Sequence, residues 1–238
     1  MKVFSTLKQW LGDAADVLMP RTCSACRKAL GDDERYLCRR CLEELPVTRF
    51  ETVRFNEMEK LLMGGVRIER ATSYFYYERG SKYAGVLHDI KYHNMPRLGQ
   101  WLAERAAREI QSSGFFTGVE AVVPVPLHRD KLAKRGYNQS LYLARGIAEA
   151  TGLAVVEALV ATRDHSTQTH KSADERARNI AGVFDVPPRL AAQVQGLHVL
   201  IVDDVMTTGA TLRECAHRLM DAGVAAISVF TLAAARLQ

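Results

Sequence analysis

Long apolar runs are missing from this chain of 238 residues, and so is a strong excess of either charge. No segment approaches the roughly 18 uninterrupted apolar residues of a transmembrane helix, so the sequence predicts none. Positions 1–19 also fail as a signal peptide, because Lys8, Asp13 and Asp16 interrupt any apolar core. We therefore expect a cytoplasmic protein. The net charge of +5 tolerates phosphate-rich partners, including nucleic acid, without requiring them.

The composition, 47% apolar and 25% charged, is typical of a globular protein, and the length allows one α/β domain with a small appendage. The N-terminal segment places Phe4, Leu7 and Leu11 on one face of an amphipathic helix. We expect that face to pack on the rest of the protein, with contact to a membrane surface or a partner as the alternative. The expected parts are the N-terminal helix at 1–19, a cysteine module at 20–46, a connector with a strand and helices that pack on the core at 47–118, and the core at 119–238.

Four of the five cysteines form two C-x-x-C pairs, Cys23 with Cys26 and Cys38 with Cys41. Two such pairs complete the tetrahedron of thiolates that a structural Zn²⁺ prefers and leave no position open for catalysis. Two disulfides or a redox pair are the alternatives, which a reducing cytoplasm disfavours. Nearby arginines would partly offset the charge of a four-thiolate site, and they could equally touch nucleic acid. Cys215 stands alone in a predicted helix, where we expect a small buried hydrophobe.

Residues 198–214 are the most informative part of the chain. An apolar strand at 198–202 delivers Asp203 and Asp204 to a turn rich in hydroxyl groups, and a helix follows. Ligands of open α/β sheets collect at the carboxyl ends of such strands, and a helix N-terminus favours an anion. We predict that the two carboxylates face a ribose diol or its metal. The residues predicted to bind a 5′-phosphate are Thr207, Thr208, Gly209, Ala210 and Thr211.

This arrangement resembles the signature of type I phosphoribosyltransferases. In those enzymes two acidic residues hold the ribose hydroxyls of phosphoribosyl pyrophosphate (PRPP), and the threonine-rich turn holds its phosphate. The alternative is an ordinary strand, turn and helix with an Asp cap, which leaves the repulsion between two adjacent carboxylates without an offset.

Apolar periodicity predicts strands that alternate with helices, which favours a parallel, doubly wound sheet. The predicted strands are 71–77, 119–125, 153–159, 198–202 and 225–233. The predicted helices are 98–110, 138–151 and 211–222, with a short one near 56–63 and another after Gly80. The fold class we expect is α/β, a type I phosphoribosyltransferase-like parallel sheet with an N-terminal four-cysteine zinc finger.

Two polar segments are candidates for further contacts with a phosphate-rich ligand. In the first, a proline-stiffened turn leads to Arg129 and Arg135, which by position would grip a pyrophosphate; a solvated basic loop is the alternative. Asn138 is expected to cap the helix that follows. The second, 163–180, is long and inserted between core strands, as an active-site lid would be. Arg176 would then close over a polyphosphate, with a surface hairpin as the alternative.

Five blocks in this order resemble the ComF family, and the resemblance runs from about residue 20 to about residue 233. The blocks are the paired C-x-x-C motifs, His88-Asp-Ile-Lys-Tyr92, Val123-Pro-Val-Pro with Arg135-Gly-Tyr-Asn-Gln139, Gln168 with Glu175-Arg-Ala-Arg-Asn179, and Val202-Asp-Asp-Val-Met-Thr-Thr-Gly-Ala-Thr211. The resemblance implies a bacterial, zinc-finger-bearing phosphoribosyltransferase-like protein of the cytoplasm. It also implies a role in DNA uptake during natural transformation or, in a related branch, in the use of DNA as a nutrient.

Two functions of different classes follow. In the first, Mg²⁺ bridges the pyrophosphate of PRPP, Asp203 and Asp204 orient the ribose, and a nitrogen nucleophile of an unknown acceptor attacks C1. In the second, the protein is not an enzyme: the pocket senses a ribose phosphate and the zinc finger grips single-stranded DNA during uptake. A protein of the DNA-uptake machinery is the partner that the resemblance suggests. We favour the transferase-like protein, with turnover itself left open.

Overall fold

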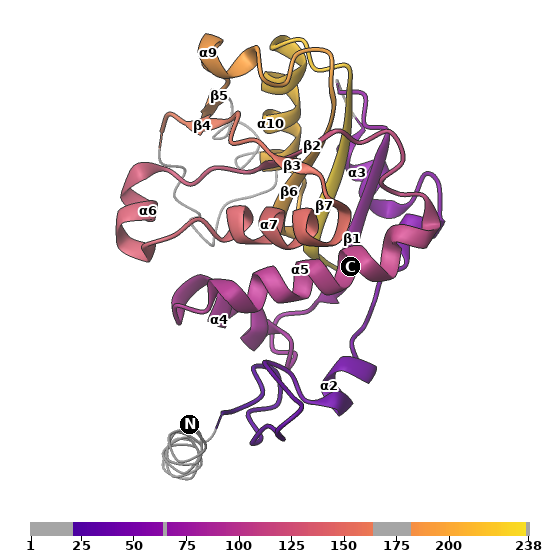
Figure 1. Ribbon diagram of the computed structural model, residues 1–238, viewed down its shortest axis with the longest axis vertical. Helices are drawn as coiled ribbons and strands as arrows, with labels where there is room; N and C mark the ends of the chain where they lie inside the picture. The colour runs from indigo at the N-terminus through magenta and orange to yellow at the C-terminus, as the bar shows by residue number, and fades with distance from the viewer. Residues whose placement is uncertain (1–20, 64–65, 164–181, 237–238) are drawn as a thin grey trace, which may run out of the picture.

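The computed structural model describes residues 21–63, 66–163 and 182–236 (Figure 1). The helix predicted at 1–19 lies outside the described residues, as does Arg176 with nearly all of the predicted lid. Among the helices that are described, none has the length and apolar character needed to cross a bilayer.

Five parallel strands form the main sheet, as the alternation of strands and helices predicted. Across the sheet their order is β1 (Arg70–Tyr77), β7 (Ala226–Ala235), β6 (His198–Met206), β2 (Ala121–Pro124) and β3 (Ala154–Val155). A separate antiparallel pair joins β4 (Val160–Ala161) to β5 (Phe184–Asp185).

Helices cover both faces of the sheet and form the connections between its strands (Figure 1). Before β2 the helices are α2 (Arg39–Glu43), η1 (Phe50–Thr52), α3 (Glu57–Leu62), α4 (Ala84–Tyr92), α5 (Pro96–Ile110) and η2 (Gln111–Ser113). After β2 they are α6 (Arg129–Arg135), α7 (Gln139–Thr151), α9 (Pro188–Ala191) and α10 (Ala210–Asp221).

Strand β6 shows how the two faces are built. Its side chains alternate between two buried clusters, because successive residues of a strand point to opposite faces. Leu200 and Val202 join the cluster that contains α5 and α7, whereas Val199 and Ile201 join the cluster that contains α10. All four are fully buried. The continuous apolar run of this strand therefore reflects burial on both sides.

The structure differs from the predicted elements in three places. Strand β6 extends to Met206, so the acidic pair lies within the strand, because Asp203 continues the parallel register with β7. The strand predicted at 153–159 pairs only over Ala154–Val155, since the chain then leaves the sheet edge to form β4. The expected basic loop after β2 contains α6, which His128 caps at its start and Gly136, at φ +82°, ends.

The cysteine module lies beside α4 and α5, away from the sheet (Figure 1). Its buried residues Cys23, Leu37 and Cys41 belong to the same apolar cluster as α4 and α5. Tyr36 of the module packs its ring 5.6 Å from that of Trp101 on α5. The module is therefore continuous with the core of the protein.

Candidate functional site: an acidic pair in a basic cavity

A cavity of about 1130 Å³ opens at the carboxyl ends of β2 and β6. It is lined from four directions: by the end of β1, by α4, by the β2–α6 connection and by the acidic strand with its turn. Several of its lining side chains are basic, namely Arg79, His88, Lys91, Lys131, Lys134 and Arg135. A concave site with convergent charged groups at this edge is where an α/β sheet binds ligands.

Asp203 and Asp204 are both almost fully buried in the wall of this cavity. Ser140 Oγ, at the start of α7, donates a hydrogen bond to Asp203 Oδ1 at 2.9 Å, and the Asp204 N–H donates to the same oxygen at 2.9 Å. Burial, together with the neighbouring Asp204 carboxylate, raises the pKa of Asp203 to about 7 despite these bonds. At neutral pH the site therefore holds a carboxyl group that gains or loses a proton readily.

Lys91 of α4 supplies the cation that faces this pair. Its Nζ lies 2.8 Å from Asp204 Oδ2. Burial alone would lower the pKa of Lys91, but the carboxylates of Asp204 and Asp203 outweigh it and raise that pKa. Lys91 thus stays charged and balances part of the acidic pair. The sequence identified Lys91 only through its family block, since nothing in the local pattern places α4 against β6.

The predicted phosphate turn follows the acidic pair directly. Gly209 takes φ +72° as the residue before α10, and no side chain caps that helix. Arg213 holds the turn in place, donating to Thr208 O at 3.1 Å and to Leu61 O at 2.6 Å. Thr207 and Thr211 line the cavity, whereas Thr208, Gly209 and Ala210 do not. The start of α10, which no side chain caps, therefore lies next to cavity-lining hydroxyl groups.

The segment after β2 brings one of its two predicted arginines to the cavity. Arg135 lines the cavity, and its Nη1 donates a hydrogen bond to Gln139 Oε1. Its Cζ lies 5.4 Å from the centre of the Tyr92 ring. Arg129 is not a lining residue, and its side chain is 89% exposed. Lys131, which the sequence placed with the two arginines at this edge of the sheet, also lines the cavity, and so does Lys134, which the sequence did not single out.

Asn138 fixes the geometry of this wall, and its predicted capping role is confirmed. Its Oδ1 accepts a hydrogen bond from the Ser140 N–H at 3.1 Å, which caps α7. Its Nδ2 donates to Val125 O at 3.0 Å, at the end of β2. One side chain therefore positions both the β2–α6 connection and Ser140, which holds Asp203.

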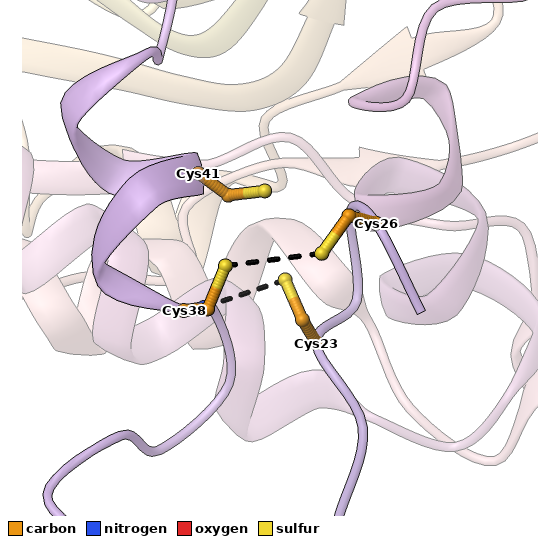
Figure 2. Close-up of side chains that lie close together, drawn as sticks. All are labelled: Cys23, Cys26, Cys38 and Cys41. Carbon is orange, nitrogen blue, oxygen red and sulfur yellow. Dashed lines mark hydrogen bonds between the residues drawn. The ribbon is translucent and has the colours of Figure 1, made fainter. Parts of the chain in front are cut away.

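The four cysteines of the module converge on one point (Figure 2). Their sulfur atoms lie within 4.8 Å of one another, and those of Cys26 and Cys38 are 3.8 Å apart. A tetrahedral site with Zn–S bonds of about 2.3 Å has sulfur–sulfur edges of about 3.8 Å. A disulfide needs a sulfur–sulfur distance of about 2.05 Å, and all five cysteines are free thiols. These four residues could therefore bind a structural zinc ion. Cys215, as expected, is a buried thiol elsewhere in the core.

Most arginines of the module already have partners. Arg27 pairs with Asp89 of α4, Arg39 with Asp33 and Arg40 with Glu44. Arg21 donates to the backbone of Glu34 at 3.2 Å. Arg27 is therefore engaged within the protein, whereas Arg39 and Arg40 remain largely exposed beside their partners.

A model of the phosphoribosyl transferase domain matches residues 138–237. The chain is 35% identical over 151 residues to the DNA utilization protein YhgH of Salmonella typhi, covering 62% of this chain and 65% of that protein. It is 34% identical over 117 residues to competence protein F of Haemophilus influenzae, covering 49% of this chain and 51% of that protein. It is 31% identical over 112 residues to competence protein ComFC of Bacillus subtilis, covering 47% of this chain and 43% of that protein.

Among solved structures, the glutamine PRPP amidotransferase of B. subtilis aligns with a TM-score of 0.42 at 21% identity, covering 61% of this chain and 30% of that one. The chain thus spans just under two thirds of the length of the first of its curated relatives. The named relatives and the domain match support a ComF-family phosphoribosyltransferase-like protein.

Proposed function

We propose that the cavity binds PRPP or another ribose phosphate and that the protein acts in DNA uptake or DNA utilisation. The observation that supports this most is one wall that combines a buried acidic pair with an uncapped helix start. Asp203 and Asp204 would accept hydrogen bonds from the ribose hydroxyls. The N–H groups at the start of α10, with Thr207 and Thr211, would hold the 5′-phosphate.

The cations around the cavity suit the other end of the ligand. Arg135 and Lys134 line the same cavity and would neutralise a pyrophosphate. Mg²⁺ would act as the counter-ion of that pyrophosphate. The acidic pair would not hold the ion, because Lys91 Nζ already lies 2.8 Å from Asp204 Oδ2. Pyrophosphate is a good leaving group, so the bond between it and ribose C1 is already activated. Catalysis would therefore consist largely of positioning and electrostatic stabilisation.

The biological role and the zinc are proposed on different grounds. The relatives are named for DNA utilization and competence, and this supports a role of the same kind here. For zinc, the support is the match between the sulfur separations and a tetrahedral site. Burial raises the pKa of Cys41, so a cation is needed before all four thiols can lose their protons.

Titration calorimetry of the zinc-loaded protein with PRPP and Mg²⁺ tests the proposal. We expect binding, and we expect the double variant Asp203→Asn and Asp204→Asn to weaken it about tenfold or more, because a hydrogen bond to a charged group contributes about 1.5–3 kcal/mol. Asp185→Asn, a change of an exposed carboxylate on β5, is the matched control and should leave the affinity unchanged. Equal affinity of the double variant and the wild type would contradict the proposed site.

A non-enzymatic DNA-binding protein with a sensor pocket remains the second candidate. It is supported by the rim of the cavity, where Tyr92 is 65% exposed beside Arg135, as a stacking and cationic surface for single-stranded DNA would be. Pyrophosphate release distinguishes the two functions. A transferase releases pyrophosphate from bound PRPP when nucleobases or amines are supplied, whereas a sensor binds PRPP and releases none.

A further inference from the structure

An ion pair with a buried carboxylate joins the cysteine module to the rest of the protein. Arg27, directly after Cys26, donates from Nη1 to Asp89 Oδ2 at 2.7 Å and from Nη2 to Asp89 Oδ1 at 3.0 Å. The Asp89 side chain is only 1% exposed. A two-point contact of this kind fixes orientation as well as distance. His93 Nδ1 also lies 2.7 Å from Asp89 Oδ1, so the buried carboxylate is held both by the module and by the end of its own helix.

Two further contacts tie the module to the same helix. A side chain at Gly85, the second residue of α4, would meet Ser24 O at 3.0 Å, so the backbone of the helix lies directly against the first C-x-x-C turn. Tyr83, which precedes α4, donates from its hydroxyl to Cys41 O at 2.9 Å, in the second C-x-x-C turn. Both halves of the module therefore contact α4.

The same helix carries Lys91, the cation that faces the acidic pair. Lys91 follows Asp89 by two residues, so the two side chains leave the helix about 200° apart. One reaches the module, and the other reaches Asp204 at 2.8 Å. Because a single helical turn joins them, a displacement at Asp89 moves Lys91 as well.

We propose that Arg27 and Asp89 are positioning residues, through which the cysteine module holds Lys91 against the acidic pair of the cavity. The module is then a support for the cavity and not an independent appendage. The placement of Lys91 follows from these contacts alone. The effect on ligand affinity rests on the proposed PRPP site.

Chemical modification tests the placement without any ligand. We would measure by mass spectrometry how fast acetic anhydride acylates Lys91, relative to exposed Lys60 on α3 in the same molecule. Arg27→Met should raise the relative rate several-fold, because Lys91 would then leave its carboxylate more often. Arg39→Met, which removes an exposed cation of the same module, should leave the rate unchanged.

Two measurements accompany the modification rates. Zinc content shows whether the module is intact, and we expect it to be the same in both variants. PRPP affinity should fall about tenfold in Arg27→Met, because the carboxylate that Lys91 holds would be misplaced and a hydrogen bond to a charged group contributes about 1.5–3 kcal/mol. It should not change in Arg39→Met. No binding of PRPP to the wild type would contradict the proposed function, while the acylation rates would still test the positioning.

An unchanged Lys91 rate in zinc-loaded Arg27→Met would overturn the proposal. Should that variant fail to fold, Arg27→Lys and Gly85→Ala decide the question. Lysine at position 27 keeps a charge beside Asp89 but cannot contact both carboxylate oxygens. The acylation rate of Lys91 in Arg27→Lys should therefore lie between the wild-type rate and that of a Lys91 that no longer contacts Asp204. Gly85→Ala presses α4 away from Ser24 and should raise the rate. Acylation of Lys91 at the wild-type rate in both Arg27→Lys and Gly85→Ala would also overturn the proposal that the module positions Lys91.

Discussion

Replacing Asp203 by asparagine should stabilise the protein, increasingly so as the pH rises. Burial and the Asp204 carboxylate raise the pKa of Asp203 from 3.8 to about 7. Between these two values the folded protein holds a proton there that the unfolded chain has lost, so the cost of ionisation to folding grows through this range and stays at its full value above it. Asparagine has nearly the same shape and can still accept the hydrogen bond from Ser140 Oγ. It carries no charge at any pH.

The magnitude follows from the size of the shift. A shift of about 3 units at about 1.36 kcal/mol per unit makes the penalty about 4 kcal/mol once the pH exceeds 7. At pH 5 the same group costs less than half of that, and below about pH 3 it costs almost nothing, because Asp203 is protonated in both states. Asp203 is only 9% exposed, so solvent screens little of this effect.

Urea unfolding of the wild type and Asp203→Asn at pH 5 and pH 8 measures the difference directly. Effects of pH on the cysteine module cancel, because both proteins contain it. Asp185→Asn, at an exposed position, should show no comparable change with pH. A stability gain that stays the same at both pH values, or that shrinks as the pH rises, would refute the assignment of a raised pKa to this carboxyl group.

Two other predictions concern packing and metal. Gly146→Ala should destabilise the protein by about 3 kcal/mol or more, because the added carbon would lie 2.1 Å from Gln100 O, where α7 crosses the backbone of α5. Urea unfolding measures this loss. Gly31→Ala is the control, because the atom nearest to its added carbon would be 3.5 Å away. Cys26→Ser should reduce bound zinc from about one ion per chain to a small fraction, since a structural site needs all four ligands; full zinc content in a colorimetric release assay would contradict the four-cysteine site.

The local elements of this fold could be predicted because their signals lie within short stretches of sequence. The apolar run before Asp203 specifies a strand buried on both faces. Asn138 caps α7, the helix that directly follows it in the sequence, with its own side chain. The cysteine spacing likewise brings its two pairs within reach of one ion. Helix α6 was missed because its start depends on a histidine ring that accepts from the Asp130 N–H, which no common capping pattern signals.

The composition of the site could not be predicted in the same way. Ser140 meets Asp203 across 63 positions of sequence, and Arg27 meets Asp89 across 62. Such pairs depend on how α4 and α7 pack on the sheet, and packing is decided by the summed burial of many side chains and not by any one motif. The sequence alone thus determined the acidic strand, its turn and the metal-binding pattern. Only the tertiary structure decided that Lys91 balances part of the charge of the acidic pair and that the cysteine module contacts the helix that carries it.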